Sequence, residues 1–172
     1  TKAAPSNLKH YNVPVIFNGE MYINLKSFAE NGTFSILFGL NSISSSCGGV
    51  DSMQIEFSYS NGIYCGIYEY QTENVPTDIS AKKKYGSLKI GTAFKLEVKA
   101  YTDKRVDVYI DSQPVVIGKP IKTDLAGFIS CVSTGKNNVE ASNFNVYAFA
   151  YDNPQNVDYT ETFDGGYNSN VF

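Results

Sequence analysis

Two alternating segments joined by a tight turn constrain this chain more than any other feature. Residues 94–100 place an apolar side chain at every second position, with Lys or Glu in between. After Asp103-Lys104 the alternation resumes over residues 106–110, and Asp111-Ser112 leads into a further segment at 113–117. A period of two residues is typical of a strand with one buried face and one solvent face. The pattern predicts an antiparallel hairpin followed by another strand.

The rest of the chain repeats this pattern in short pieces. Asn31-Gly32 and Asn61-Gly62 are hairpin signals, because Asn and Gly tolerate a positive φ. Residues 71–80 contain Pro76 and no periodicity, so we expect a long surface loop there. Residues 13–17 are expected at a sheet edge, since Pro14 cannot donate a backbone hydrogen bond. The other expected strands cover residues 21–28, 34–40, 55–59, 63–70, 87–90, 128–133 and 144–148.

This spacing of short strands predicts one all-β domain, a two-sheet antiparallel β-sandwich of the jelly-roll type. A length of 172 residues suits a single domain. We expect a lead-in at residues 1–12 and the sandwich at 13–151. Residues 152–172 are either a linker towards a following module or a final strand, at 159–163, that returns to the sheet.

Charge and cysteine content exclude several classes of partner. A formal net charge of -3 argues against a nucleic-acid binder, and the one dense basic run, Lys82-Lys83-Lys84, is interpreted as a solvated loop. No apolar run approaches the roughly 20 residues that span a bilayer, so no membrane insertion is expected. Cys47, Cys65 and Cys131 contain no CxxC pair, which argues against zinc. Cys65 and Cys131 are either small buried hydrophobes in strands, or one disulfide forms and one thiol is left over.

The order of the strands resembles a known superfamily. Phe94-Lys95-Leu96-Glu97-Val98, a turn, and Val106-Asp107-Val108-Tyr109-Ile110-Asp111 are followed by Gly127-Phe128-Ile129-Ser130 and Asn143-Phe144-Asn145-Val146-Tyr147. This succession resembles concanavalin A-like lectin and laminin G-like domains, and is most similar to bacterial carbohydrate-binding modules of family 66. The resemblance covers residues 19–150 and rests on strand patterns. It implies a concanavalin A-like jelly roll; the absence of Trp departs from many sugar-binding modules.

No catalytic apparatus is visible, so we do not expect an enzyme. Glucanases related to this fold carry a Glu-x-Asp-x-Glu or Glu-x-Asp-x-x-Glu run on one strand, and this chain has none. Asp107 and Asp111 would lie about 13 Å apart along a strand, too far for a carboxylate pair. The sole histidine, His10, falls in the polar lead-in. A glycosidase is kept only as a remote alternative.

Tyrosines supply the best candidate binding residues. Tyr64, Tyr68 and Tyr70 share the strand face opposite Ile63, Cys65 and Ile67, and Tyr101 and Tyr109 are expected to extend that surface. A Tyr ring offers an apolar plane to the C–H face of a sugar and a hydroxyl to its edge. The alternative is that these rings pack under loops or against a neighbouring strand. The polar groups expected to orient a ligand beside them are Asp51, Gln54, Glu69 and Asn74.

Together these features lead to two hypotheses. The first is a non-catalytic carbohydrate-binding, lectin-like module of a larger secreted or cell-surface bacterial protein, with a poly- or oligosaccharide as ligand and neighbouring modules as further partners. The second is a protein-binding adhesin, a receptor-binding domain or a structural sandwich. No cofactor is expected. A structural Ca²⁺ is conceivable on this fold, but no compact Asp-x-Asp or Asp-x-Asn run assigns its ligands.

Overall fold

The computed structural model of the protein describes residues 15–40, 52–70, 76–123, 125, 128–149 and 158–162. Asp51, Asn74 and Cys47 lie outside them, so their expected roles stay predictions. None of the described residues belongs to a helix that is long and apolar enough to cross a bilayer. The described strands are β1 (Val15–Ser27), β2 (Thr33–Leu40), β3 (Ser52–Tyr59), β4 (Ile63–Tyr70), β5 (Pro76–Lys84), β6 (Phe94–Tyr101), β7 (Arg105–Ile110), β8 (Gln113–Pro120), β9 (Phe128–Thr134), β10 (Asn138–Phe149) and β11 (Asp158–Thr162).

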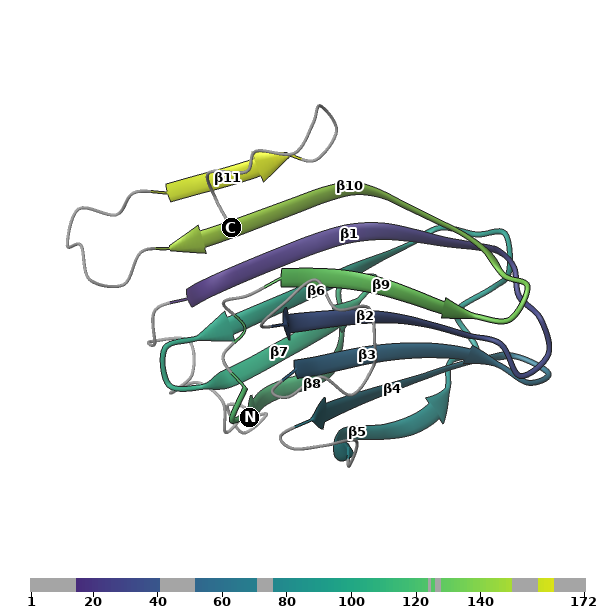
Figure 1. Cartoon of the computed structure of the whole chain (residues 1–172), viewed down its shortest axis with the longest axis horizontal. Helices are drawn as coiled ribbons and strands as arrows, with labels where there is room; N and C mark the ends of the chain where they lie inside the picture. The colour runs from purple at the N-terminus through teal and green to yellow at the C-terminus, as the bar shows by residue number, and fades with distance from the viewer. Residues whose placement is uncertain are drawn as a thin grey trace, which may run out of the picture.

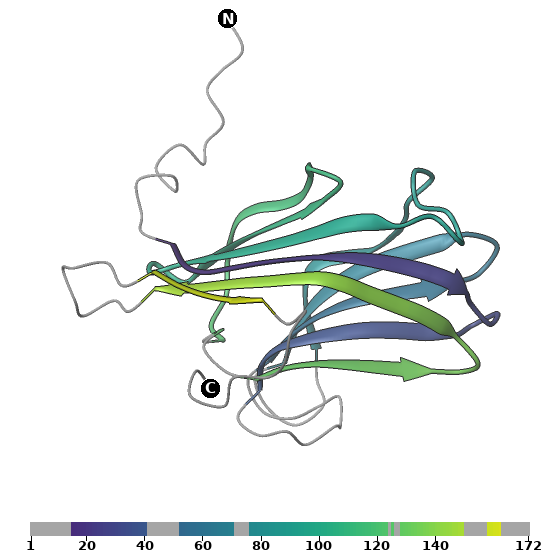
Figure 2. The same ribbon diagram turned by 90° about the horizontal axis from the view of Figure 1, so that it is seen from above.

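The strands form two antiparallel sheets that face one another (Figure 1). One sheet has six strands in the order β11-β10-β1-β6-β7-β8, and the other has five in the order β5-β4-β3-β2-β9. Figure 2 shows the two layers from above. The chain changes sheet after β1, β5, β8 and β9, so strands that are distant in sequence become neighbours. This arrangement confirms the expected all-β, two-sheet antiparallel sandwich.

Alternation along each strand produces the core between the sheets. Ile63 and Ile67 of β4 are at most 2% exposed, and Leu96 of β6 is 1% exposed. The two layers meet through aromatic rings, since the centroids of Phe57 in β3 and Phe94 in β6 are 5.1 Å apart. Removing these apolar side chains from water is the main stabilising contribution, at about 25 cal/mol per Å² of buried apolar area.

The expected turns are confirmed at two hairpins. Asn61 and Gly62, between β3 and β4, have φ angles of 49° and 137°. Asp111 and Ser112, between β7 and β8, have φ angles of 48° and 62°. Positive φ at both central residues matches the right-handed twist of the flanking strands, which is why such short loops close a hairpin.

Three expectations about the first half of the chain are wrong. The turn at Asn31-Gly32 closes no hairpin, because it joins β1 to β2 in the other sheet. Residues 13–17 were expected to form an edge strand, but β1 is one continuous strand, Val15–Ser27, with β10 on one side and β6 on the other. A loop was expected at residues 71–80, but residues 76–80 belong to β5, which begins at Pro76. Strand β5 is an edge strand whose side chains are mostly exposed, so its sequence shows no alternation.

The short strand expected at residues 87–90 is also wrong. This segment is a turn region in which the backbone N–H of Leu88 donates to the carbonyl of Tyr85. Leu88 is 6% exposed because it packs into the core from a loop. An apolar residue that anchors a loop has the same sequence signature as one residue of a strand.

The two described cysteines are both free and differ in environment. Cys65 lies in the core, where burial raises its pKa to about 12, so its thiol stays neutral. Cys131 is exposed because β9 is an edge strand. The interpretation as a small buried hydrophobe is therefore confirmed for Cys65 and wrong for Cys131.

Candidate functional site

The three tyrosines of β4 lie on the outer face of the five-stranded sheet, which we define as the face turned away from the core. Tyr64, Tyr68 and Tyr70 are half-buried and alternate with residues buried between the sheets. The cross-strand partners of Tyr64 and Tyr68 in β3 are Ser58 and Gln54. The structure therefore confirms that the three tyrosines share the face of β4 opposite its buried residues.

A shallow pocket of about 450 Å³ opens on this outer face, and we call it the Tyr64 pocket. Tyr64, Ser58 and Thr33 line it and form one row of cross-strand partners over β4, β3 and β2. The surrounding residues are Asn31, Tyr59 and Ser60 from strand ends and turns, and Lys82 from β5.

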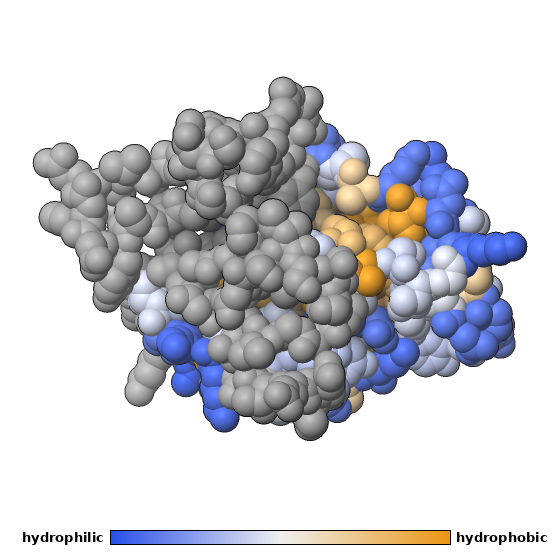
Figure 3. All heavy atoms as spheres, in the orientation of Figure 1, coloured by the Kyte–Doolittle hydropathy of each residue, from blue (hydrophilic) through white to orange (hydrophobic). Residues whose placement is uncertain are grey.

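The surroundings of the pocket are largely polar. In Figure 3, which views this face, hydrophilic side chains gather at the right-hand end of the molecule, where Figure 1 places the turns after β1 and β3. Apolar surface is visible next to this end, right of the centre of the view. A ring beside hydroxyl and amide groups is the composition expected for a site that binds a small polar molecule.

Tyr68 lies along the strand, over Gly66. A Cβ atom added to Gly66 would come within 2.7 Å of the Tyr68 Cζ atom, so the ring occupies the space that any other side chain would need. Burial and the neighbouring carboxylates Glu56 and Asp78 raise the pKa of Tyr68 to about 12. Its hydroxyl group therefore stays protonated and can donate a hydrogen bond. A glycine inside a strand often marks such a close approach.

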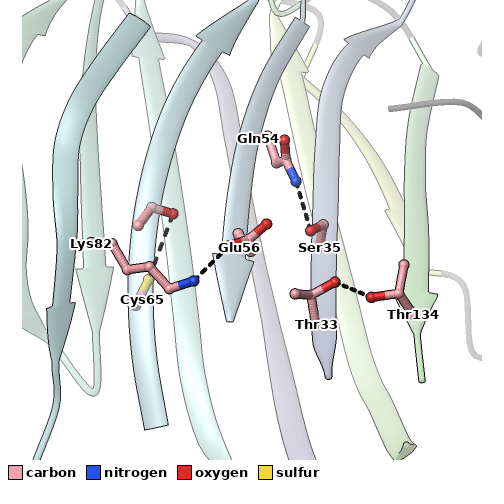
Figure 4. Close-up of polar contacts among 8 residues, drawn as sticks. Thr33, Ser35, Gln54, Glu56, Cys65, Lys82 and Thr134 are labelled. Carbon is pink, nitrogen blue, oxygen red and sulfur yellow. Dashed lines mark hydrogen bonds and ion pairs between the residues drawn. The ribbon is translucent and has the colours of Figure 1, made fainter. Parts of the chain in front are cut away.

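Polar side chains connect neighbouring strands across the same face (Figure 4). Lys82 Nζ lies 3.2 Å from Glu56 Oε1. Gln54 Nε2 donates to Ser35 Oγ at 2.7 Å, and the Gln54 side chain is buried with no partner for its Oε1 atom. Gln54 thus lies on the expected face but is covered, whereas Lys82 and Asp78 are accessible charged groups beside the tyrosines.

Glu69 does not lie with the tyrosines, so the expectation that it orients a ligand beside them is wrong. It has the same parity as Ile63 and Ile67, and it is 6% exposed. Its Oε1 accepts hydrogen bonds from the backbone N–H groups of Lys122 and Thr123, at 2.5 and 2.6 Å, and from Thr123 Oγ1 at 2.8 Å. Glu69 therefore anchors the segment that follows β8 instead of facing the outer surface.

Tyr101 and Tyr109 lie on the six-stranded sheet, so they do not extend the surface formed by Tyr64 and Tyr68. Both hydroxyl groups donate to Asp107 Oδ2, at 2.8 and 3.3 Å respectively. The expected contribution of Tyr109 to the same site conflicts with this placement, because the core separates the two outer faces. Residue spacing alone does not reveal which of two sheets a strand joins.

Among the described residues, no group of three or more His, Cys, Asp and Glu side chains is arranged to hold a metal ion. The residues around the Tyr64 pocket offer hydroxyl groups, one amide, aromatic rings and an ammonium group. This set is suited to hydrogen bonding and stacking on a bound molecule.

Solved structures of similar architecture include the carbohydrate binding module CBM66 from Bacillus subtilis. That structure matches with a TM-score of 0.56 and 13% sequence identity, over 77% of this chain and 75% of the other. The protein has a concanavalin A-like jelly-roll fold. Sheep galectin-11, solved in complex with glycerol, matches with a TM-score of 0.47 and 15% identity, over 75% of this chain and 92% of the other.

No protein-family model and no curated protein sequence matches the chain. At 13% identity, the likeness to CBM66 establishes the jelly roll and nothing about its ligand. The function therefore has to be argued from the Tyr64 pocket.

Proposed function

We propose that this jelly roll is a non-catalytic carbohydrate-binding module of a larger secreted or cell-surface bacterial protein. The observation that carries the proposal is the Tyr64 pocket, where an aromatic ring lies in one row with the hydroxyl groups of Ser58 and Thr33. A pyranose presents an apolar C–H face and a rim of hydroxyl groups, and this row offers a matching surface to each.

The charged groups support binding without catalysis. Hydrolysis of a glycosidic bond needs two carboxyl groups facing one cleft, about 5 to 10 Å apart. None of the described residues that line the Tyr64 pocket carries a carboxyl group. The nearby carboxylate of Glu56 is bound to Lys82. A shallow site of this kind is expected to bind with micromolar to millimolar affinity.

A glycan array followed by titration tests the proposal. We expect the protein to bind members of an array of plant, mucin and bacterial polysaccharides, run with and without Ca²⁺. For the strongest hit, Tyr64→Ala should weaken binding at least tenfold, because stacking on the ring is lost. Tyr64→Phe should retain most of the affinity, and the thermal midpoint should change little because Tyr64 is only half-buried.

Tyr22 provides the matched control. It is 40% exposed on β1 of the six-stranded sheet, so Tyr22→Ala removes a similar ring far from the pocket. Equal losses from Tyr22→Ala and Tyr64→Ala would contradict the assignment of the site. A blank array obtained with folded protein would contradict carbohydrate binding itself and favour the protein-binding alternative.

Gly66→Ala tests whether the position of Tyr68 matters. The added methyl group would collide with the Tyr68 ring, whose far end can swing away at little cost. We expect affinity for the array hit to fall about fivefold to tenfold while the free energy of unfolding changes by less than about 1 kcal/mol. Isothermal titration and urea unfolding measure the two quantities. Unchanged affinity would exclude Tyr68 from the binding surface.

A further inference from the structure

The basic run at residues 82–84 is divided between the two faces of edge strand β5. Lys84 is the cross-strand partner of Tyr64 and therefore lies on the outer face. Lys83 is directed elsewhere, and its Nζ lies 5.3 Å from the centroid of the Tyr85 ring. The run is thus part of a strand that borders the Tyr64 pocket, and not the solvated loop that its sequence indicates.

Lys82 lies on the same face as Lys84, two residues away along β5, and a β-bulge begins next to it. The register between β4 and β5 shifts so that Ala81 and Lys82 together oppose the single residue Gly66. Bulges commonly redirect a side chain beside a functional site. Lys82 lines the pocket and binds Glu56, and the two side chains are 41% and 21% exposed respectively. The ammonium group is thus the more accessible member of the pair.

The lining of the pocket carries a positive charge, although the chain as a whole has a formal net charge of -3. Apart from Lys82, the described residues that line the pocket are neutral. Lys84 lies one strand away from Tyr64, with its Nζ bonded to the neutral carbonyl group of Asn61. The carboxylates of Glu56 and Asp78 on the same face lie outside the pocket lining, opposite Gly66 and Tyr68 of β4 respectively. An anionic ligand would be attracted here, most strongly at low ionic strength.

We propose that the Tyr64 pocket selects acidic saccharides, with the carboxylate of a uronic-acid-type sugar bound by Lys82 while its ring contacts Tyr64. This inference rests on the proposed function and deepens it. The row of hydroxyl groups at Ser58 and Thr33 favours a sugar over a simple inorganic anion, because it can hydrogen-bond the remaining hydroxyl groups of the ring. The carboxylate of an acidic ligand would compete with the Glu56 carboxylate for the ammonium group of Lys82.

The test is an array in which each acidic glycan is printed beside its own methyl ester. The probes are oligogalacturonate, oligoguluronate and sialyllactose, each with its own methyl ester. Esterification removes the charge and keeps the ring, so it isolates the contribution of the carboxylate. We expect the acidic member of each bound pair to give the signal, and its affinity to fall as salt is raised.

Three substitutions are expected to change the affinity for the acidic glycan differently: one lowers it, one raises it and one leaves it nearly unchanged. Lys82→Gln should weaken binding of the acidic glycan about tenfold, because its carboxylate partner is lost. Glu56→Gln should strengthen binding severalfold, because it frees Lys82 from a competing carboxylate. Lys83→Gln is the matched control, since it removes the same charge from the neighbouring residue that lies against Tyr85. We expect it to leave the affinity within twofold.

The outcomes separate this inference from the function on which it rests. Equal binding of acids and esters would overturn acidic selectivity and leave carbohydrate binding intact. Equal losses from Lys82→Gln and Lys83→Gln would also overturn it, since general charge attraction would then explain the binding. A blank array would overturn both proposals. Thermal midpoints of all three variants, within a few degrees of the parent, establish that the comparison concerns folded protein.

Discussion

Replacing Glu69 with alanine is expected to lower the free energy of unfolding by about 3 kcal/mol. The carboxylate is 6% exposed and accepts hydrogen bonds from two backbone N–H groups and one hydroxyl group. Thr123 is itself 3% exposed, so water cannot readily take over the role of the lost acceptor. A buried donor that loses its partner costs about 1 to 3 kcal/mol.

Urea unfolding followed by circular dichroism measures this loss. Glu69→Gln keeps a carbonyl oxygen on a side chain of the same length and should be less damaging. Glu140→Ala is the control for a surface carboxylate, because the Glu140 side chain is 57% exposed in its ion pair with Lys26. We expect that control to cost less than about 1 kcal/mol. Similar losses for Glu69→Ala and Glu140→Ala would show that the anchoring hydrogen bonds contribute little.

Asp107→Ala is expected to be destabilising by a similar amount, about 3 kcal/mol, on the other sheet. Asp107 is completely buried, and its two carboxylate oxygens accept hydrogen bonds from the hydroxyl groups of Tyr101 and Tyr109 and from the backbone N–H of Gly118. Gly118 has a φ of 61° at an irregularity in the pairing of β7 with β8. The carboxylate therefore holds a deformed piece of backbone in place.

A double-mutant cycle separates hydrogen bonding from packing at this position. Tyr101→Phe removes the donor at 2.8 Å, and Tyr109→Phe removes the longer contact at 3.3 Å. We expect the cost of Asp107→Ala to be smaller in the Tyr101→Phe background, because the hydroxyl that needs the acceptor is gone. The cycle is measured by urea unfolding. Strictly additive losses, measured with both Tyr101→Phe and Tyr109→Phe, would mean that the two tyrosine hydroxyl groups do not account for the contribution of Asp107.

Local patterns explain why so much of the fold could be predicted from the sequence. Strands β6, β7 and β8 could be predicted because their alternating residues and the turn residues between them lie within a few positions of one another. Strand β5 could not be predicted, because an edge strand with mostly exposed side chains has no buried face and therefore no alternation of apolar and polar residues. The length and central position of β1 depend on β10 and β6, which come much later in the chain.

The candidate site could be predicted only in part for the same reason. The face of Tyr64 and Tyr68 follows from parity along one strand, and the same parity already places Glu69 on the opposite face. The pocket depends on how β2, β3, β4 and β5 are aligned, and the pairing of β5 with β4 that brings Lys82 beside it has no signal within β5. Gly66 did carry a usable signal, because a glycine between two tyrosines in a strand indicates that something lies close above it.

Strand β4 turns its core residues and the anchoring Glu69 to one face and its half-buried tyrosines to the other. Inserting or deleting one residue within it would exchange the two faces, turning tyrosine rings into the core and isoleucines into water. Evolution can therefore alter this part of the surface by substitution but not by changing its length. The hairpin turn at Asn61 and Gly62 is under no such restriction. Homologues of this domain should accordingly differ by insertions and deletions in the turns around the pocket, and by substitutions within β4.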